Sequence, residues 1–191
     1  TKSIKIAKKF LDQKNKFDDY SDFLEDLKMK CEEKRFNIEA SERLSEMTYK
    51  TNQFNFTFQK YNIEKIKKIS KSKNLSFYYS LKDRFIDHGI IASVNITFDK
   101  NKNATLDSFV MSCRVFDKTL ENFIFSSIKK KLLKLNVKKL NAIFIQTDRN
   151  KRFYDFYESF NFKKIKKIKN KFFYSIQTQY IKDKDNYISN Y

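Results

Sequence analysis

The sequence predicts a mixed α/β fold with one central sheet, an antiparallel middle and a βαβ unit at its end. Strand-like and helix-like apolar patterns alternate in the order strand, helix, helix, three strands, helix, strand, helix, strand. The chain has 191 residues, 40% of them hydrophobic, which suits a single domain that can build its own core.

The first elements precede and open the main domain. Residues 4–11 and 22–27 have helical apolar spacing and predict two short helices, and residues 28–36 follow as a weak strand. Asn37 and Asn62 each precede a run with helical spacing. Each is expected to cap a helix, because an Asn side chain accepts a hydrogen bond from a free N–H of the first turn.

Three strand patterns follow, over residues 75–81, 89–98 and 104–116, and the polar residues 99–103 have the length of a hairpin loop. The remaining elements are a helix over 120–135, a buried strand over 140–146, a helix over 153–160 with aromatic residues on one face, and a strand over 172–176. We expect a sheet of roughly six to seven strands flanked by about four helices.

Composition disfavours several classes of protein. Two cysteines, Cys31 and Cys113, are too few for a disulfide scaffold, and reduced thiols in a cytoplasmic protein are the simpler interpretation. No apolar run approaches the roughly 18 residues of a membrane span, and the N-terminus lacks the apolar stretch of a secretory signal. With one histidine and no Cys-x-x-Cys or His-x-x-x-His pair, no metal site is expected.

The net charge of +18 points to an anionic partner such as nucleic acid, a membrane surface or an acidic protein. The single Gly, the lack of Pro and the abundance of Lys, Asn, Ile and Phe indicate an A+T-rich coding sequence, which explains part of this charge. The chain lacks helix-turn-helix, zinc-finger and RNP-type patterns, so nucleic acid is disfavoured. The lysine-rich residues 163–171 fit either a basic partner surface or a solvated edge.

Residues 114–119, Arg-Val-Phe-Asp-Lys-Thr, lie between a predicted central strand and the next helix. They resemble the pyrophosphate loop of GNAT acyltransferases, Arg/Gln-x-x-Gly-x-Gly/Ala, whose order of elements this chain shares. Asp117 and Thr119 replace the glycines that let backbone N–H groups approach a diphosphate, so ordinary acetyl-CoA binding is expected to be weak. The resemblance implies that a phosphopantetheine arm, of coenzyme A or of a carrier protein, contacts Arg114, Val115, Lys118 and Thr119.

The region 150–162 resembles the second GNAT signature, Asn-x-x-Ala-x-x-x-Tyr-x-x-x-Gly-Phe. Asn150, Tyr157 and Phe162 fall at its spacing, and Asn161 replaces the Gly. Asn is the next best residue for a left-handed helix end, so the geometry is kept. The resemblance implies that Asn150 contacts the phosphopantetheine arm and that Tyr157 is the general acid to the leaving thiolate. Packing against neighbouring Phe rings is the alternative for Tyr157.

Three longer stretches are KTNQFN at residues 50–55, LKDRFIDHGII at 81–91 and FVMSCRV at 109–115. They resemble, in the same order, the KTNQFN, DRFGDHG and F-x-MSCRV stretches of the FkbH-like family, a subfamily (IIIC) of the haloacid-dehalogenase (HAD) superfamily. The resemblance covers about residues 20–178. It departs from the family at Ile86, which replaces a Gly, and at the two loop residues named above.

In that family a HAD-like domain precedes a GNAT-like domain, and the protein loads a glyceryl unit from 1,3-bisphosphoglycerate onto an acyl carrier protein as a thioester. The resemblance therefore implies an acyltransferase with no intrinsic cofactor, whose partners are an acyl carrier protein and a HAD-like domain. The only Asp-x-Asp, Asp183-Lys184-Asp185, lacks the preceding strand of a HAD-type site. We expect interdomain helices over 1–27 that follow a HAD-like domain absent from this chain, a GNAT-like domain over 28–178 and a polar tail over 179–191.

The candidate catalytic residues are Cys113, His88 and Tyr157. A Cys113 thiolate could carry the glyceryl group before it reaches the carrier thiol, or the residue could pack in an apolar row with Phe109, Met111 and Val115. His88 is the only imidazole and hence the only histidine base available, with turn capping as its alternative role.

The candidate substrate-binding residues are Asn52, Gln53, Asn55, Asp83, Arg84 and Asp87. The amides could hold a carbonyl or hydroxyl of a glyceryl unit, or they could end a helix through bonds to the backbone. Asp83 or Asp87 could orient His88. We expect Asn52, His88, Cys113 and Arg114 to converge on one ligand-sized pocket, and we expect the sheet to splay next to the strand that ends at Arg114.

Three functions remain open at this stage. The first is the acyl-transfer half of a glyceryl-loading protein, and the second is a CoA-dependent GNAT N-acetyltransferase. The third is a non-catalytic module that docks a carrier protein.

Overall fold

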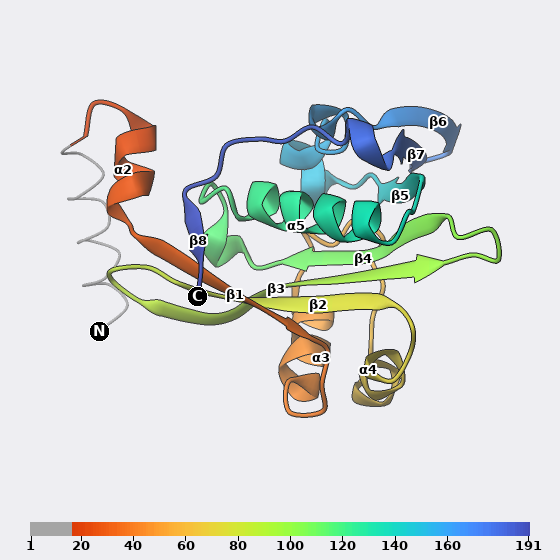
Figure 1. Ribbon diagram of the computed structural model, residues 1–191, viewed down its shortest axis with the longest axis horizontal. Coiled ribbons are helices and arrows are strands. Elements are labelled where there is room, and N and C mark those ends of the chain that lie inside the picture. Colours follow the sequence, from red (N-terminus) through yellow and green to blue (C-terminus); the bar gives the residue numbers. More distant parts are fainter. Residues whose placement is uncertain (1–16) are drawn as a thin grey trace.

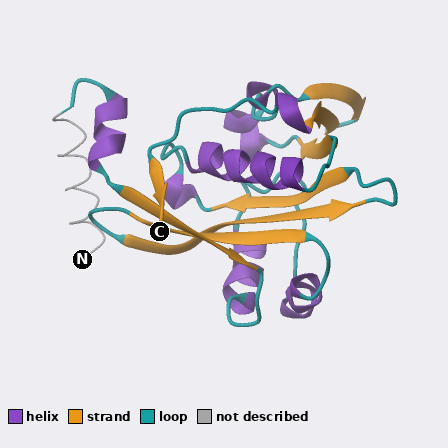
Figure 2. Cartoon of the chain, viewed as in Figure 1, coloured by secondary structure: helices purple, strands orange, loops and turns teal. Residues whose placement is uncertain are grey.

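The computed structural model describes residues 17–191 and contains one eight-stranded mixed sheet with helices on both faces (Figure 1). One face is covered by α5, and α3 and α4 lie on the other (Figures 1 and 2). The helices are α2 (Tyr20–Asp26), α3 (Ser41–Lys50), α4 (Ile63–Ser70) and α5 (Leu120–Lys134), with 3₁₀ turns η1 (Cys113–Val115), η2 (Asp148–Phe153), η3 (Glu158–Phe160) and η4 (Thr178–Tyr180). This architecture confirms the predicted mixed α/β class.

The strands follow the order β6-β7-β5-β4-β3-β2-β1-β8 across the sheet. Their bounds are β1 (Met29–Arg35), β2 (Leu75–Lys82), β3 (Asp87–Phe98), β4 (Ala104–Met111), β5 (Lys139–Ile145), β6 (Lys163–Ile168), β7 (Lys171–Gln177) and β8 (Ile188–Asn190). The middle strands β1 to β4 pair antiparallel. β4 pairs in parallel with β5, and α5 connects these two strands along the chain. The antiparallel middle is as predicted, and β4, α5 and β5 form a βαβ unit, whereas the next pair, β5 and β7, is antiparallel and differs from the predicted βαβ end.

A wedge of backbone separates β4 from β5. The two strands pair over only three residues of each and diverge beyond them. Residues 54–56, which we call the wedge, fill the gap. The Met111 N–H donates to the Phe54 carbonyl (3.1 Å), and the Ile145 N–H donates to the Phe56 carbonyl (2.8 Å). The predicted splay exists, and the chain itself satisfies the backbone groups that it exposes.

Aromatic packing holds the wedge in place. Phe54 and Phe56 are fully buried, with their ring centroids 4.4 Å apart. The Phe54 ring also contacts the rings of Phe109, Phe116, Phe153 and Phe156. This core lies between the sheet and α5, and a smaller core joins α3 and α4 to the opposite face.

Several expected elements differ from the structure. The sheet has one strand more than the upper limit expected, because residues in the polar tail form β8 beside β1. Instead of one helix, residues 153–160 contain the last residue of η2, a turn over residues 154–157, and η3. Asn62 caps α4 as predicted, whereas Asn37 accepts from the Ala40 N–H in a turn before α3 begins. The helix expected at residues 4–11 lies outside the described residues.

Candidate functional site

A pocket of about 570 Å³ brings four of the predicted residues together. Its lining comes from α3, the segment that follows α3, η1 with the residue on either side of it, and the start of η2. The lining residues are Arg43, Met47, Lys50, Thr51, Asn52, Gln53, Ser112, Cys113, Arg114, Phe116 and Arg149. Asn52 and Gln53 thus lie in one pocket with Cys113 and Arg114, although the two motifs are far apart in the sequence.

The thiol of Cys113 is exposed in this pocket. β4 ends at Met111, so Cys113 lies in the η1 turn and not in the strand. The Ser112 N–H donates to the Ile91 carbonyl of β3 (2.8 Å), which fixes the start of the turn. The alternative that Cys113 packs in a buried row with Met111 is therefore wrong. The other cysteine, Cys31, is buried, and its burial raises the pKa of the thiol to about 12.

The pocket also carries cations that sequence reasoning missed. Arg43 and Lys50 both pair with Glu46 (2.7 and 2.5 Å), and the contact with Lys50, then that with Arg43, holds the pKa of Glu46 at about 2. Arg149 immediately precedes Asn150 of the second signature, which was the only sequence signal for it. Within residues 17–191, no acidic side chain pairs with Arg114 or Arg149.

His88 does not line this pocket. Its Nε2 lies 2.9 Å from Asp83 Oδ2, and the Lys118 ammonium lies 3.2 Å from the same oxygen. Burial alone would raise the pKa of Asp83. The hydrogen bonds from His88 and from the Phe85 N–H, together with the charge of Lys118, hold it well below its usual range. Lys118 is buried, which corrects its expected role as a contact for phosphopantetheine.

The other residues of the second FkbH-like stretch shape the turn between β2 and β3. The Arg84 guanidinium binds both carboxylate oxygens of Asp26 (2.5 and 2.6 Å), and Asp87 accepts from the Gly89 N–H (2.8 Å). Gly89 has φ +63°, a backbone conformation that glycine adopts readily and residues with a Cβ adopt rarely. Arg84 and Asp87 do not line the pocket either, and their contacts are those of a folded turn.

Two residues implied by the GNAT signature have structural contacts. Tyr157 is buried, and the pKa of its hydroxyl is raised, first by burial and then by Tyr174. Its ring packs against Phe56 and Phe156, as in the packing alternative. Asn150 is buried, accepts from the Thr147 N–H (2.9 Å) and donates to the Ile145 carbonyl (2.8 Å).

Asn55, the third amide of the KTNQFN stretch, is also buried. Its side chain donates to the carbonyls of Thr48 and Gln59, both at 3.3 Å. It therefore shapes the bend that leads from α3 through the wedge, as in the helix-ending alternative. Only Asn52 and Gln53 of this amide group face the pocket.

The loop between β4 and α5 has a glycine-like backbone without glycine. Asp117 and Thr119 have φ +65° and +58°, a conformation that costs most residues roughly 1–2 kcal/mol. Asp117 pairs with Arg152 (2.7 Å). In the first turn of α5, burial raises the pKa of Glu121, and its Oε2 has no hydrogen-bond partner within the described residues. Val115 is buried. One carboxylate thus lies in the loop before α5 and a second lies in the first turn of that helix.

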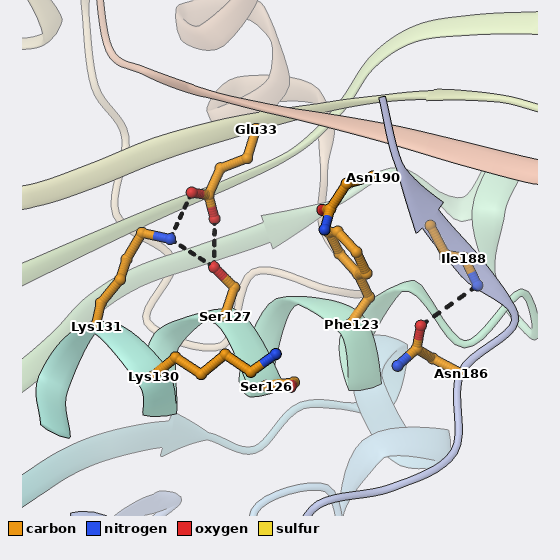
Figure 3. A pocket seen from close by; sticks show the side chains of 9 residues that line it. All are labelled: Glu33, Phe123, Ser126, Ser127, Lys130, Lys131, Asn186, Ile188 and Asn190. Carbon is orange, nitrogen blue, oxygen red and sulfur yellow. Dashed lines mark hydrogen bonds and ion pairs between the residues drawn. The ribbon is translucent and has the colours of Figure 1, made fainter. Parts of the chain in front are cut away.

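A second pocket, of about 350 Å³, lies between α5 and β8 (Figure 3). Its polar groups already bond with one another. The Glu33 carboxylate lies 2.5 Å from the Lys131 ammonium and accepts from the Ser127 hydroxyl (2.5 Å). No candidate site residue lines it, so the Cys113 pocket is the candidate site.

Within residues 17–191, no group of three or more His, Cys, Asp or Glu side chains could hold a metal ion. In the same range no helix is long and apolar enough to cross a membrane.

Solved structures share this fold. A domain from Methanocaldococcus jannaschii matches with a TM-score of 0.60 and 22% identity, over 78% of this chain and 99% of that domain. The PaiA N-acetyltransferase of Thermoplasma acidophilum, solved in complex with coenzyme A, matches with a TM-score of 0.62 and 15% identity, over 77% and 98% of the two chains. A GNAT-family acetyltransferase from Bacillus anthracis matches with a TM-score of 0.55 and 13% identity, over 77% and 94%.

These matches show that the chain has the GNAT fold. No family model matches it, and no curated protein does. At such low identity the likeness concerns the fold alone, so function has to be argued from the site.

Proposed function

We propose that this chain is an acyltransferase domain that passes a glyceryl or related short acyl unit, as a thioester, to an acyl carrier protein. One observation carries the proposal: Asn52 and Gln53 from one FkbH-like stretch share a pocket with Cys113 and Arg114 from another. The pocket thus combines two amides, an exposed thiol and a guanidinium. A HAD-like partner domain would supply the acyl unit, as the resemblance implies.

The proposed transfer has two covalent steps. The Cys113 thiolate attacks the acyl carbonyl, a new C–S bond forms, and the donor's leaving group takes up the proton that the thiol lost. The phosphopantetheine thiol of the carrier protein then attacks this thioester. Cys113 leaves and regains a proton as the carrier thiol loses one. Asn52 and Gln53 can donate to, and accept from, the glyceryl hydroxyls and so orient the acyl group.

Intact-mass spectrometry tests the covalent step. The chain is incubated with a glyceryl thioester of N-acetylcysteamine, and holo acyl carrier protein is then added. We expect a glyceryl adduct on the chain that moves to the carrier. Cys113→Ser should abolish the adduct, and the matched control Cys31→Ser should keep it, because Cys31 is buried. Transfer at the normal rate in Cys113→Ser would show that the domain only positions the two reactants. Carrier binding without any transfer would favour the docking module.

The alternative function is CoA-dependent N-acetyl transfer, which the likeness to the CoA-bound PaiA structure favours. One feature of this chain opposes it: Asp117 precedes α5 and Glu121 lies in the first turn of that helix. A diphosphate would meet these carboxylates. We expect calorimetry with acetyl-CoA to give weak binding or none. Micromolar affinity that survives moderate salt would make the N-acetyltransferase the better reading.

A further inference from the structure

The walls of the Cys113 pocket carry positive charge and no carboxylate. Arg43, Lys50, Arg114 and Arg149 line it, and no Asp or Glu does. Arg43 and Lys50 share the nearby Glu46, which offsets part of their charge. The net charge on the wall beside the thiol therefore depends mainly on Arg114 and Arg149.

These two arginines differ from the others in the chain. The other arginines each contact a carboxylate or a backbone carbonyl: Arg35 with Asn74, Arg43 with Glu46, Arg84 with Asp26, and Arg152 with Asp117. In the described part of the chain, the only hydrogen bond of the Arg114 side chain goes from Nε to the Ser112 hydroxyl (3.3 Å), and Arg149 makes none. The terminal N–H groups of both guanidinium groups can therefore donate hydrogen bonds to a ligand in the pocket.

A guanidinium group matches a carboxylate or a phosphate with two parallel hydrogen bonds. Arg114 is the residue next to Cys113 and both line this pocket, so an anion bound by Arg114 lies in the same pocket as the reacting sulfur. A phosphate at the far end of an extended phosphopantetheine arm is too distant from the thiol to occupy this place. The charge therefore fits the acyl group better than the carrier arm.

We propose that the Cys113 pocket selects short acyl thioesters whose acyl group carries a carboxylate or a phosphate, which Arg114 and Arg149 bind. This inference rests on the proposed function and narrows its acyl unit from neutral glyceryl to charged relatives such as phosphoglyceryl. In the reaction, Cys113 sulfur bonds to the acyl carbon, the donor C–S bond breaks, and the departing thiolate takes up the proton of the Cys113 thiol. The anionic end of the acyl group takes no part in the bond changes.

The test compares small thioesters, so that no carrier protein contributes charge. Succinyl, succinyl monomethyl ester and 3-phosphoglyceryl thioesters of N-acetylcysteamine are each incubated with the chain, and Cys113 acylation is followed by intact mass. We expect the two anionic thioesters to react about tenfold or more faster than the neutral ester, since one charge-assisted contact supplies that factor. The difference between the succinyl and phosphoglyceryl rates tells whether carboxylate or phosphate is preferred.

Variants locate the preference. Arg149→Gln should lower the rates with the anionic thioesters about tenfold, and the rate with the neutral ester much less. Arg35→Gln removes the same charge on β1, outside the pocket, and should keep the preference. Equal rates for neutral and anionic thioesters, or a preference that survives Arg114→Gln/Arg149→Gln, would overturn the inference.

A failure of the proposed function gives a different result. If none of the thioesters acylates Cys113, the covalent step is wrong, and the anion preference is measured by calorimetry with non-reactive amide analogues of the same compounds. Tighter binding of the anionic analogues, lost in Arg149→Gln, would support the charge selection by itself. Equal binding of neutral and anionic analogues would reject it.

Discussion

Asp83 links two segments through its buried carboxylate, which contacts His88 in β3 and Lys118 before α5. Because its pKa is lowered in the folded state, the ionised form stabilises the fold above the unfolded pKa of about 3.9, and this contribution is lost as the pH falls through the folded value. We expect Asp83→Asn to lower the free energy of unfolding at pH 7 by roughly 3 kcal/mol, since it removes a carboxylate that offsets the Lys118 charge.

Urea unfolding at pH 7 and pH 3 measures this. The difference between wild type and variant should shrink at pH 3, where the unfolded carboxyl is protonated. Asp87→Asn is the control, because Asp87 is exposed and caps only the Gly89 N–H. An equal loss at both pH values would show that the charge of Asp83 is not what stabilises the fold.

The pKa of Glu121 shifts in the opposite direction to that of Asp83. Its pKa is raised, chiefly by burial, so the protonated form contributes stability below the unfolded pKa of about 4.3, and this is lost as the pH rises through the folded value. Glu121→Gln removes a buried negative charge and should raise the free energy of unfolding at pH 7. At pH 4 the effect should be near zero. Thermal unfolding at the two pH values checks it, and destabilisation at pH 7 would contradict it.

Among the elements, the wedge fixes the distance between β4 and β5. Phe54 is completely buried against five other Phe rings. Phe54→Ala leaves a cavity and is expected to lower the free energy of unfolding by about 3–5 kcal/mol. Ile38→Ala, at a side chain that is 55% exposed, should change it by less than about 0.5 kcal/mol. Chemical denaturation measures both, and equal effects would show that the wedge is not tightly packed.

Elements with a buried face could be predicted from sequence, and others could not. β3 and α5 have apolar periodicity because they cover a core. All six residues of β6 are exposed, so the strand shows no apolar alternation to read. At residues 153–160 the aromatic spacing fits a helix, but the same spacing also serves two 3₁₀ turns that bring Phe153 and Phe156 against the wedge.

The site could be predicted only where its residues lie in recognisable local stretches of sequence. Asn52 and Cys113 lie in stretches that a family resemblance marks, and both line the pocket. The contact of Lys118 with Asp83 joins residues 35 positions apart and depends on the tertiary fold. No local pattern in the sequence indicates that Lys118 is buried or that His88 lies outside the pocket lining. Arg149 likewise lacks a motif of its own.

At the scale of the whole molecule, β8 closes one edge of the sheet by pairing in parallel with β1. Its Ile188 is buried. Ile188→Asp places a charge in that contact and should release β8, which lowers the melting temperature by several degrees, as a loss of 1–2 kcal/mol does in a domain of about this size. The uncovered β1 edge should also favour self-association.

Tyr191→Asp adds the same charge at a side chain that is 68% exposed and serves as the control. Calorimetry and size-exclusion chromatography of the two variants compare the effects. A normal melting temperature and a monomeric profile for Ile188→Asp would show that β8 does not protect the sheet edge.

The wedge has a consequence for how the two halves of the sheet communicate. Asn52 and Gln53 line the pocket, and the next residue, Phe54, accepts the hydrogen bond from Met111 in β4. Two residues further, Phe56 accepts the bond from Ile145 in β5. An acyl group that binds to the two amides therefore restricts the motion of the wedge, whose carbonyls bond to both β4 and β5. The amide protons of Met111 and Ile145 should then exchange with deuterium more slowly when the pocket is filled. Their exchange rates would thus measure, at the splay between β4 and β5, whether the site is occupied.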